Sequence, residues 1–208
     1  MNDFSVAMAL VDYIPVILFG YAAALLQRAL YDKMTKASFA LFAAGTINVF
    51  AAGFLKATWK LLYAAGICDF AALNEMFFPV QSIGFLLAGG GILLMLYKMN
   101  RVRNATLLAV PPVFSGTFVF VGLMVAGLGC MDGGLCYIAS KMKKRGAVCL
   151  FMVSFVCSLC MGYLSSKDFA QAYMNWIAEI VNICGQGLFL AGVLALEKAG
   201  LKEFDWRK

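Results

Sequence analysis

The chain contains no histidine and little charge. Of its 208 residues, Asp, Glu, Lys and Arg together make up 13%, about half of the roughly 25% found in globular domains. Without an imidazole, a histidine base and a histidine metal ligand are both excluded. So few charged residues cannot cover the outside of a soluble protein, whereas hydrophobic residues make up 63% of the chain. We therefore expect one all-α integral membrane domain over residues 1–208.

Five apolar runs are long enough to cross a membrane as helices, since about 20 apolar residues span the hydrocarbon core. The runs are Tyr13–Leu30, Ser38–Leu55, Met76–Tyr97, Gly146–Leu164 and Tyr173–Leu196. Between the third and the fourth run lies a segment, Ala105–Ser140, of 36 residues with one charged residue. This segment is too long for one helix and barely long enough for two, so length alone allows six or seven spans.

The distribution of Lys and Arg favours seven spans. With six spans, the basic residues divide 7 to 10 between the two sides of the membrane, and with seven they divide 14 to 3. Cytoplasmic loops carry an excess of Lys and Arg, and these residues also contact anionic lipid headgroups. We therefore expect seven helices in the plasma (inner) membrane, with the N-terminus outside and the C-terminus in the cytoplasm. A re-entrant hairpin within Ala105–Ser140 fits the same count and is an alternative.

Two parts of the sequence match at a nearly constant offset. Lys33-Met34 and Leu41-Phe42 match Lys141-Met142 and Leu150-Phe151 at offsets of 108 and 109. Residues Asn74, Gln81, Gly84, Leu87 and Gly91 match Asn175, Asn182, Gly185, Leu188 and Gly192, all at an offset of 101. We therefore predict a 3+1+3 parallel internal repeat, a scheme found in transporters. Repeat one covers residues 11–98, a linker helix (the fourth helix) 104–121, repeat two 122–198 and a short cytoplasmic tail 199–208.

This layout resembles that of the SWEET sugar carriers, the nicotinamide riboside carriers and the microbial rhodopsins. The resemblance concerns the number and grouping of helices and rests on no motif. Where the sugar carriers have a Pro-Gln pair, this sequence has Pro79-Val80-Gln81. The last span contains no lysine before Lys198, which argues against a retinal pigment. A layout alone implies no function.

Polar side chains within the predicted spans are the candidate ligand-binding residues. They are Asn175, Glu179, Asn182 and Gln186 in the last span, Asn74 and Gln81 in the third, and Asn48 in the second. The four in the last span are spaced four, three and four residues apart, which places them on one face of a helix. Polar groups within a membrane usually face the bundle interior or a water-filled cavity. We interpret them as lining a ligand or ion pathway; the alternative is hydrogen bonding between helices.

Two acidic residues are candidates for binding a proton or a cation, because an ionised carboxylate within a membrane is costly. Glu179 has no basic partner in the membrane that the sequence reveals, which favours a functional role. Asp132 lies at mid-membrane if a helix runs over Leu123–Ser140. If the chain turns at Asp132-Gly133-Gly134, it is instead a solvated turn residue. Both alternatives for Asp132 stay open.

These features favour a transporter or channel for a small solute or ion, with protons as candidate co-substrates. The site would lie between the two three-helix halves, with no nucleic acid, cofactor or metal involved. The second hypothesis is a membrane sensor or scaffold that binds a ligand, a partner membrane protein or a second copy of the chain. The third is a lipid-modifying enzyme. Without histidine, metal motif or nucleophile elbow, no catalytic residue is predicted, and an enzyme is the weakest of the three.

Overall fold

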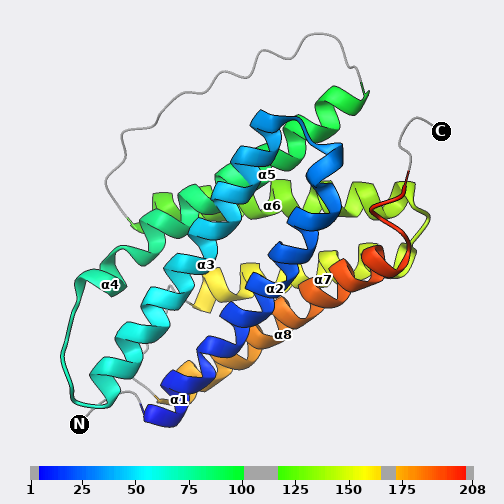
Figure 1. Cartoon of the computed structure of the whole chain (residues 1–208). Helices are drawn as coiled ribbons and strands as arrows, with labels where there is room; N and C mark the ends of the chain where they lie inside the picture. Colours follow the sequence, from blue (N-terminus) through cyan, green and yellow to red (C-terminus); the bar gives the residue numbers. More distant parts are fainter. Residues whose placement is uncertain (1–4, 101–116, 165–171, 205–208) are drawn as a thin grey trace.

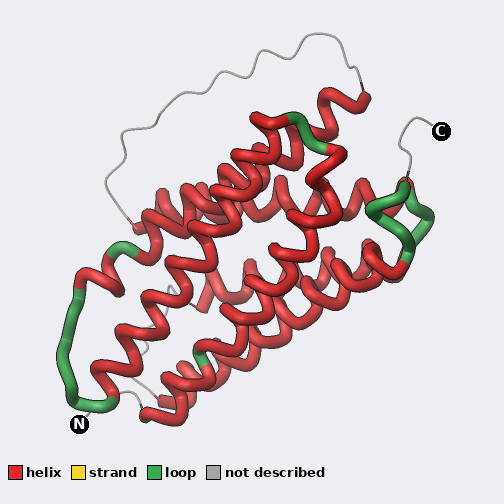
Figure 2. The backbone as a smooth tube through the Cα atoms, viewed as in Figure 1, coloured by secondary structure: helices red, strands yellow, loops and turns green. Residues whose placement is uncertain are grey.

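The computed structural model describes residues 5–100, 117–164 and 172–204, and the regular structure in these ranges is helical (Figures 1 and 2). The helices are α1 (Val6–Val11), α2 (Tyr13–Leu30), the short 3₁₀ helix η1 (Tyr31–Lys33), α3 (Lys36–Ala64), α4 (Ala72–Glu75), α5 (Phe77–Asn100), α6 (Thr117–Lys141), α7 (Arg145–Leu164) and α8 (Ala172–Lys198). The prediction of an all-α fold is confirmed for this part of the chain.

Six helical segments among the described residues are long and apolar enough to cross a membrane. They are Val6–Lys33, Lys36–Ala64, Ala72–Lys98, Val119–Lys141, Arg145–Leu164 and Tyr173–Lys198. The predicted linker helix at 104–121 falls mostly outside the described residues, so seven spans stays a prediction. Helix α6 is continuous through Asp132, so the alternative of a turn at Asp132-Gly133-Gly134 is wrong.

Local sequence signals set several of the helix ends. The Thr35 hydroxyl accepts a hydrogen bond from the Ser38 backbone N–H at 3.3 Å and caps the start of α3, because the first N–H groups of a helix have no partner within it. After α8, Gly200 has a φ of +80°, a left-handed conformation that glycine adopts without strain. The chain therefore leaves α8 just beyond its last apolar turn.

Close contacts at glycines fix the relative directions of three helices. Along α3 and α5, Gly45 contacts Ala88, whereas Phe42 contacts Gly91 further along α5, so these two helices are antiparallel. Along α5 and α6, Gly89 contacts Gly127, and Ile92 contacts Gly134, so these two run in the same direction. Helices α5 and α6 therefore both end at the same end of the bundle (Figure 1).

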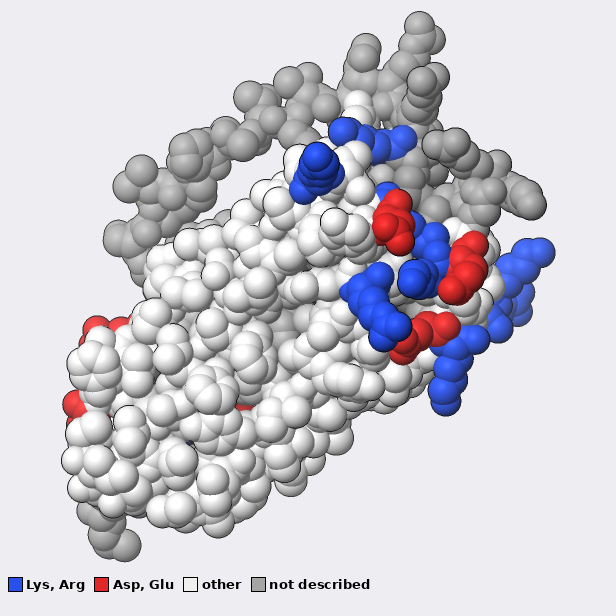
Figure 3. Space-filling view, in the orientation of Figure 1, with Lys and Arg blue, Asp and Glu red and all other residues white. Residues whose placement is uncertain are grey.

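Basic side chains gather at that end, which we call the basic end (Figure 3). From their positions at or just beyond the helix ends that meet there, the described basic residues of this end are Arg28, Lys33, Lys36, Lys98, Lys141, Lys143, Lys144, Arg145, Lys198 and Lys202. Between the two ends, the face in Figure 3 carries an uncharged belt. Exposed apolar side chains along the helices include Ile17, Ile47, Phe54, Ile83, Met152, Val156 and Ile180. This distribution suits a bundle surrounded by lipid.

The half of the bundle near the basic end is filled by apolar side chains. Ile92, Met95, Leu135, Ile138 and Leu196, from α5, α6 and α8, are all at most 1% exposed. In lipid, helix association depends on close packing and on small residues that let backbones approach. Gly45 is such a residue, because a Cβ atom there would lie 2.5 Å from the Gly84 carbonyl oxygen and would collide with the Ala88 backbone.

We predict that Gly45→Ala destabilises the protein by about 1–3 kcal/mol, the usual cost of overpacking. The added methyl meets backbone atoms of α5, which cannot move aside as a flexible side chain could. Gly90→Ala is the matched control, since a Cβ atom at Gly90 has no neighbour within 4 Å. Thermal unfolding in detergent measures the difference. Equal midpoints for the two variants would contradict the close approach of α3 and α5.

Candidate functional site

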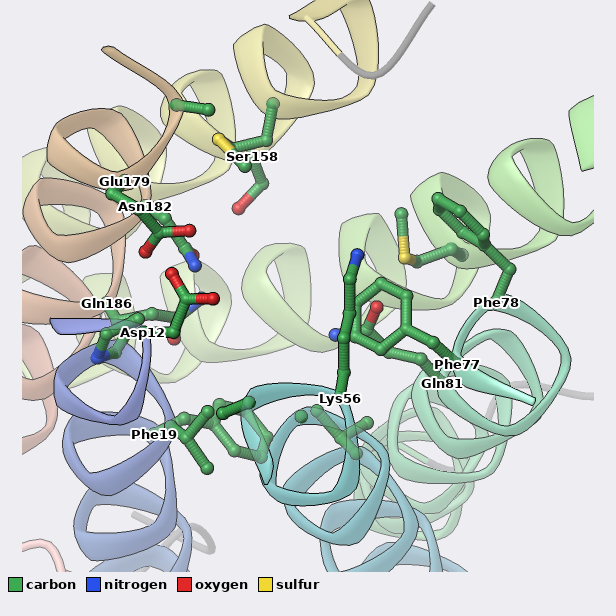
Figure 4. A pocket seen from close by; sticks show the side chains of 18 of the residues that line it. Asp12, Phe19, Lys56, Phe77, Phe78, Gln81, Ser158, Glu179, Asn182 and Gln186 are labelled. Atoms are coloured by element: carbon green, nitrogen blue, oxygen red, sulfur yellow. The ribbon is translucent and has the colours of Figure 1, made fainter. Parts of the chain in front are cut away.

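A cavity of about 410 Å³ lies between the first half of the bundle (α1–α5) and the second half (α6–α8). Helices α2, α3, α5, α6, α7 and α8 all contribute side chains to its wall (Figure 4). The cavity occupies the end of the bundle opposite the basic end, where α1, α4 and the last turns of α3 lie. We call this the cavity end.

Six of the eight predicted ligand-binding residues line this cavity. They are Asn74, Gln81, Asn175, Glu179, Asn182 and Gln186. The structure therefore brings together polar residues of α4, α5 and α8 between the two halves, where the sequence predicts that they meet. Asn48 and Asp132 are not among the lining residues. Whether the six bind a ligand stays a prediction.

Glu179 has a basic partner, contrary to the expectation from the sequence. The Lys60 ammonium on α3 forms a salt bridge with Asp12 and lies 3.5 Å from Glu179 Oε1. The side chains of Lys60, Asp12 and Glu179 are 12%, 7% and 9% exposed. These three residues, the ion cluster, join α3 to α8 and to the junction of α1 and α2. The expectation was wrong because the partner comes from another helix.

The ion cluster has unused hydrogen-bonding capacity. Asp12 Oδ1 and Glu179 Oε2 are buried and accept no hydrogen bond from the described residues. In Figure 4 the two carboxyl groups point toward the same part of the cavity. A buried oxygen without a donor is costly, so a proton shared by the two carboxyl groups, or a bound donor, would stabilise this arrangement.

Asp12, Lys56 and Lys60 are cavity residues that the sequence analysis does not name. Asp12 lies just before the run assigned as the first span, although in the structure it joins α1 to α2 and is 6% exposed. Lys56 and Lys60 are two of the three basic residues that oppose the charge bias. Two signals in the sequence could have identified them. They are four residues apart, which places them on one helix face, and they lie on the side of the membrane that is predicted to have few basic residues.

Lys56 differs from Lys60 in its surroundings. Its ammonium lies over the Phe77 ring, 3.8 Å from the ring centroid, and 5.4 Å from that of Phe78. Within the described residues, no carboxylate forms a salt bridge with it. Figure 4 shows the side chain rising from α3 into the cavity, with Phe77 and Gln81 on one side and the acidic residues across the space. The cavity thus presents one ammonium group that forms no salt bridge with a carboxylate of the described residues.

Phe19 and Phe85 line the floor of the cavity at about the middle of the bundle, and Phe189 and Phe151 extend this aromatic layer behind them. Phe19 packs against Phe85 and Phe189, with ring centroids 6.0 and 5.9 Å apart. Phe189 in turn packs against Phe151, with centroids 5.7 Å apart. All four rings are at most 4% exposed. Below them lies the packed apolar core, so the cavity ends at this layer.

Asp132 lies beneath the floor, in the packed half of the bundle. It follows the lining residue Leu128 by one turn of α6 and is 2% exposed. At 1.5 Å per residue it lies about 14 Å from Lys141 at the basic end, about half the roughly 30 Å thickness of a hydrocarbon core, and its position at mid-membrane stays a prediction. Neither of its carboxyl oxygens has a hydrogen-bond partner among the described residues. Such a costly group is a candidate functional residue.

Comparison with known proteins gives no match. No protein-family model matches the chain, and no curated protein or solved structure matches it. A proposal for function therefore depends on the geometry of the cavity.

We predict that Lys60→Met is far more destabilising than Glu179→Gln. Removing the ammonium leaves two buried carboxyl groups without their counter-ion, which typically costs about 3–5 kcal/mol. Glu179→Gln keeps the salt bridge between Lys60 and Asp12 and should cost less than about 1.5 kcal/mol. Unfolding in detergent measures both changes.

A triple variant provides the control for this comparison. Combining Lys60→Met with Asp12→Asn and Glu179→Gln removes all three charges and should recover most of the stability lost in Lys60→Met. Residues of one network show such non-additive effects. Additive losses across the series would mean that the three residues do not act as one cluster.

Proposed function

We propose that the protein is a membrane transporter for a small solute and that the solute binds in the cavity between the two halves. The main support is a correspondence between the cavity walls. The lining residues that α4 and α5 contribute are Asn74, Phe77, Phe78, Gln81 and Phe85, and those of α8 are Asn175, Ala178, Glu179, Asn182 and Gln186. Each of the five pairs is separated by 101 residues, the offset of the predicted repeat.

Packing contacts support the same repeat. A Cβ atom at Gly91 would meet Phe42, and one at Gly192 would meet Phe151. Gly91 and Gly192 are 101 residues apart, and Phe42 and Phe151 are 109 apart. The two glycines therefore match each other in the predicted repeat, and so do the two phenylalanines. In addition, α5 packs against α6, and its counterpart α8 packs against α2. These relations support two halves around a common axis, as in parallel-repeat transporters.

The shape of the cavity supports one state of an alternating-access cycle. The cavity lies at one end of the bundle. The aromatic floor and the apolar side chains beyond it separate the cavity from the basic end. Because cytoplasmic segments of membrane proteins are enriched in Lys and Arg, we infer that the basic end faces the cytoplasm and the cavity end faces outside. Rocking of one half against the other would close the cavity end and open the aromatic floor.

A sensor would use the same cavity without passing a solute through it. The correspondence between the cavity walls favours a transporter. Two related halves can rearrange so that the site opens first to one side of the membrane and then to the other, and a receptor does not need this rearrangement. Movement of solute across a sealed membrane separates the two functions.

The ion cluster is the proposed site of proton coupling. Asp12 and Glu179 share one ammonium, so the ion cluster carries one negative charge when both are ionised. Each has one carboxyl oxygen without a hydrogen-bond donor, so a proton can bind there and neutralise this charge. Burial disfavours a net charge in a cavity of this kind. A proton taken up outside and released inside would therefore drive solute uptake.

We predict that proteoliposomes containing the protein accumulate a solute from a broad panel when the outside is more acidic. With one coupled proton, a pH difference of one unit supports up to about tenfold accumulation, because each tenfold ratio corresponds to about 1.4 kcal/mol. Glu179→Gln should still equilibrate the solute but should lose this accumulation, while the folded protein persists.

The matched control is Glu197→Gln on the same helix, since Glu197 is exposed near the basic end and does not line the cavity. It should accumulate solute as the parent does. Equal accumulation by Glu179→Gln and the parent would reduce Glu179 to a structural role, with Asp132 as the remaining predicted acidic candidate. Absence of flux for every solute of the panel would contradict transport itself.

A further inference from the structure

The charges of the cavity are unevenly paired. It is lined by two acidic and two basic side chains: Asp12, Glu179, Lys56 and Lys60. Helices α5, α6 and α7 contribute no titratable side chain to the lining. Both acidic residues form salt bridges with Lys60, whereas the Lys56 ammonium lies over the rings of Phe77 and Phe78 and forms no salt bridge among the described residues.

An aromatic ring is a weak substitute for a counter-ion. A cation over a ring face is stabilised by the ring quadrupole, but an ammonium has three N–H donors that the ring satisfies poorly. Lys56 is half-buried within an apolar wall, where water replaces these hydrogen bonds incompletely. A bound anion would both neutralise the charge and accept its hydrogen bonds.

We propose that the cavity binds a small organic carboxylate, with Lys56 as the residue that recognises its charged group. This inference rests on the proposed function and specifies its substrate class. Gln81 also lines the cavity, one turn of α5 after Phe77, the ring that the Lys56 ammonium contacts, so its amide can donate to the second carboxylate oxygen. Phe77, Phe78 and Phe19 provide an apolar wall for the body of the molecule.

Charge balance connects this substrate to the ion cluster. With its four ionisable residues charged, the cavity is neutral, and a bound carboxylate would leave one negative charge in a poorly solvated space. One proton on Asp12 or Glu179 restores neutrality. A carboxylate that enters together with a proton therefore fits the cavity better than a carboxylate alone.

Three sets of probes of matched shape test the inference. The carboxylates pentanoate and benzoate are compared with their amides, pentanamide and benzamide, and with pentylammonium and benzylammonium. Binding to the purified full-length protein is measured as a ligand-dependent rise of the thermal midpoint. We expect the carboxylates to stabilise the protein and the amides and ammonium compounds to have little effect.

Lys56→Met should weaken carboxylate binding about ten- to a hundredfold, the range expected for losing a hydrogen bond between charged groups. Lys98→Met is the matched control, because Lys98 is exposed in the last turn of α5 at the basic end, and it should bind as the parent does. Lys56→Arg keeps the charge and should retain binding within roughly tenfold. The midpoint without ligand establishes that each variant is folded.

Several results would overturn the inference: stronger binding of the ammonium compounds, equal binding of carboxylates and amides, no binding of any probe, or unchanged carboxylate binding in Lys56→Met. Uptake measurements distinguish this failure from failure of the proposed function. If neutral or cationic solutes cross the membrane and carboxylates do not, transport stands and the substrate class is wrong. If carboxylates bind through Lys56 but no solute crosses, the ligand class stands and transport is wrong.

Discussion

The structure depends on the way in which three charged side chains share a site inside an apolar bundle. Each of Asp12, Lys60 and Glu179 would be costly to bury alone. Together they neutralise most of their charge and tie α3 to α8 and to the start of α2. Glu179 lies about 28 Å along α8 from Lys198 at 1.5 Å per residue. This distance is close to the roughly 30 Å thickness of a hydrocarbon core, so the cluster lies near the end of the span opposite the basic end.

The two ends of the bundle are packed differently because the charged side chains are buried at only one of them. Around the ion cluster, amides and charged groups prevent tight apolar packing, and a cavity remains. Toward the basic end, glycines and large apolar side chains interlock, with Gly45 and Gly91 letting α3 and α5 approach closely. The aromatic layer around Phe19 and Phe85 separates the two regions. A solute that crosses the membrane by way of the cavity must pass this layer, so the layer is the part of the structure that has to move.

Much of the fold could be predicted from the sequence, because a membrane-spanning helix has a length and a composition that few other structures share. The run Tyr13–Leu30 is also the observed extent of α2, and α6 and α8 begin and end within a few residues of the expected positions or extend them. The seventh span remains a prediction, because residues 104–116 of the predicted linker helix lie outside the described residues and residues 117–121 belong to the start of α6. The stripe on α8 was found because its spacing matches the helical period.

The ion cluster could not be predicted, because its members lie at the junction of α1 and α2, on α3 and on α8, far apart in the sequence. Periodicity shows which residues share a face of one helix, but it does not show which faces of different helices meet. Lys60 and Glu179 come together only through the order in which the helices pack. Asn48 illustrates the converse: it is a polar residue within a span, but the packing places it outside the cavity lining.

The most direct test of the central claim is whether the cavity can be reached from both sides of the membrane. A single cysteine is placed at Gln81 in a variant without the seven native cysteines. An impermeant thiol reagent is then applied to right-side-out or to inverted vesicles. Because alternating access exposes the same site to each side in turn, we expect modification from both sides, slowed by bound solute. Modification from the cavity end alone, with and without solute, would contradict transport through the cavity and favour a receptor.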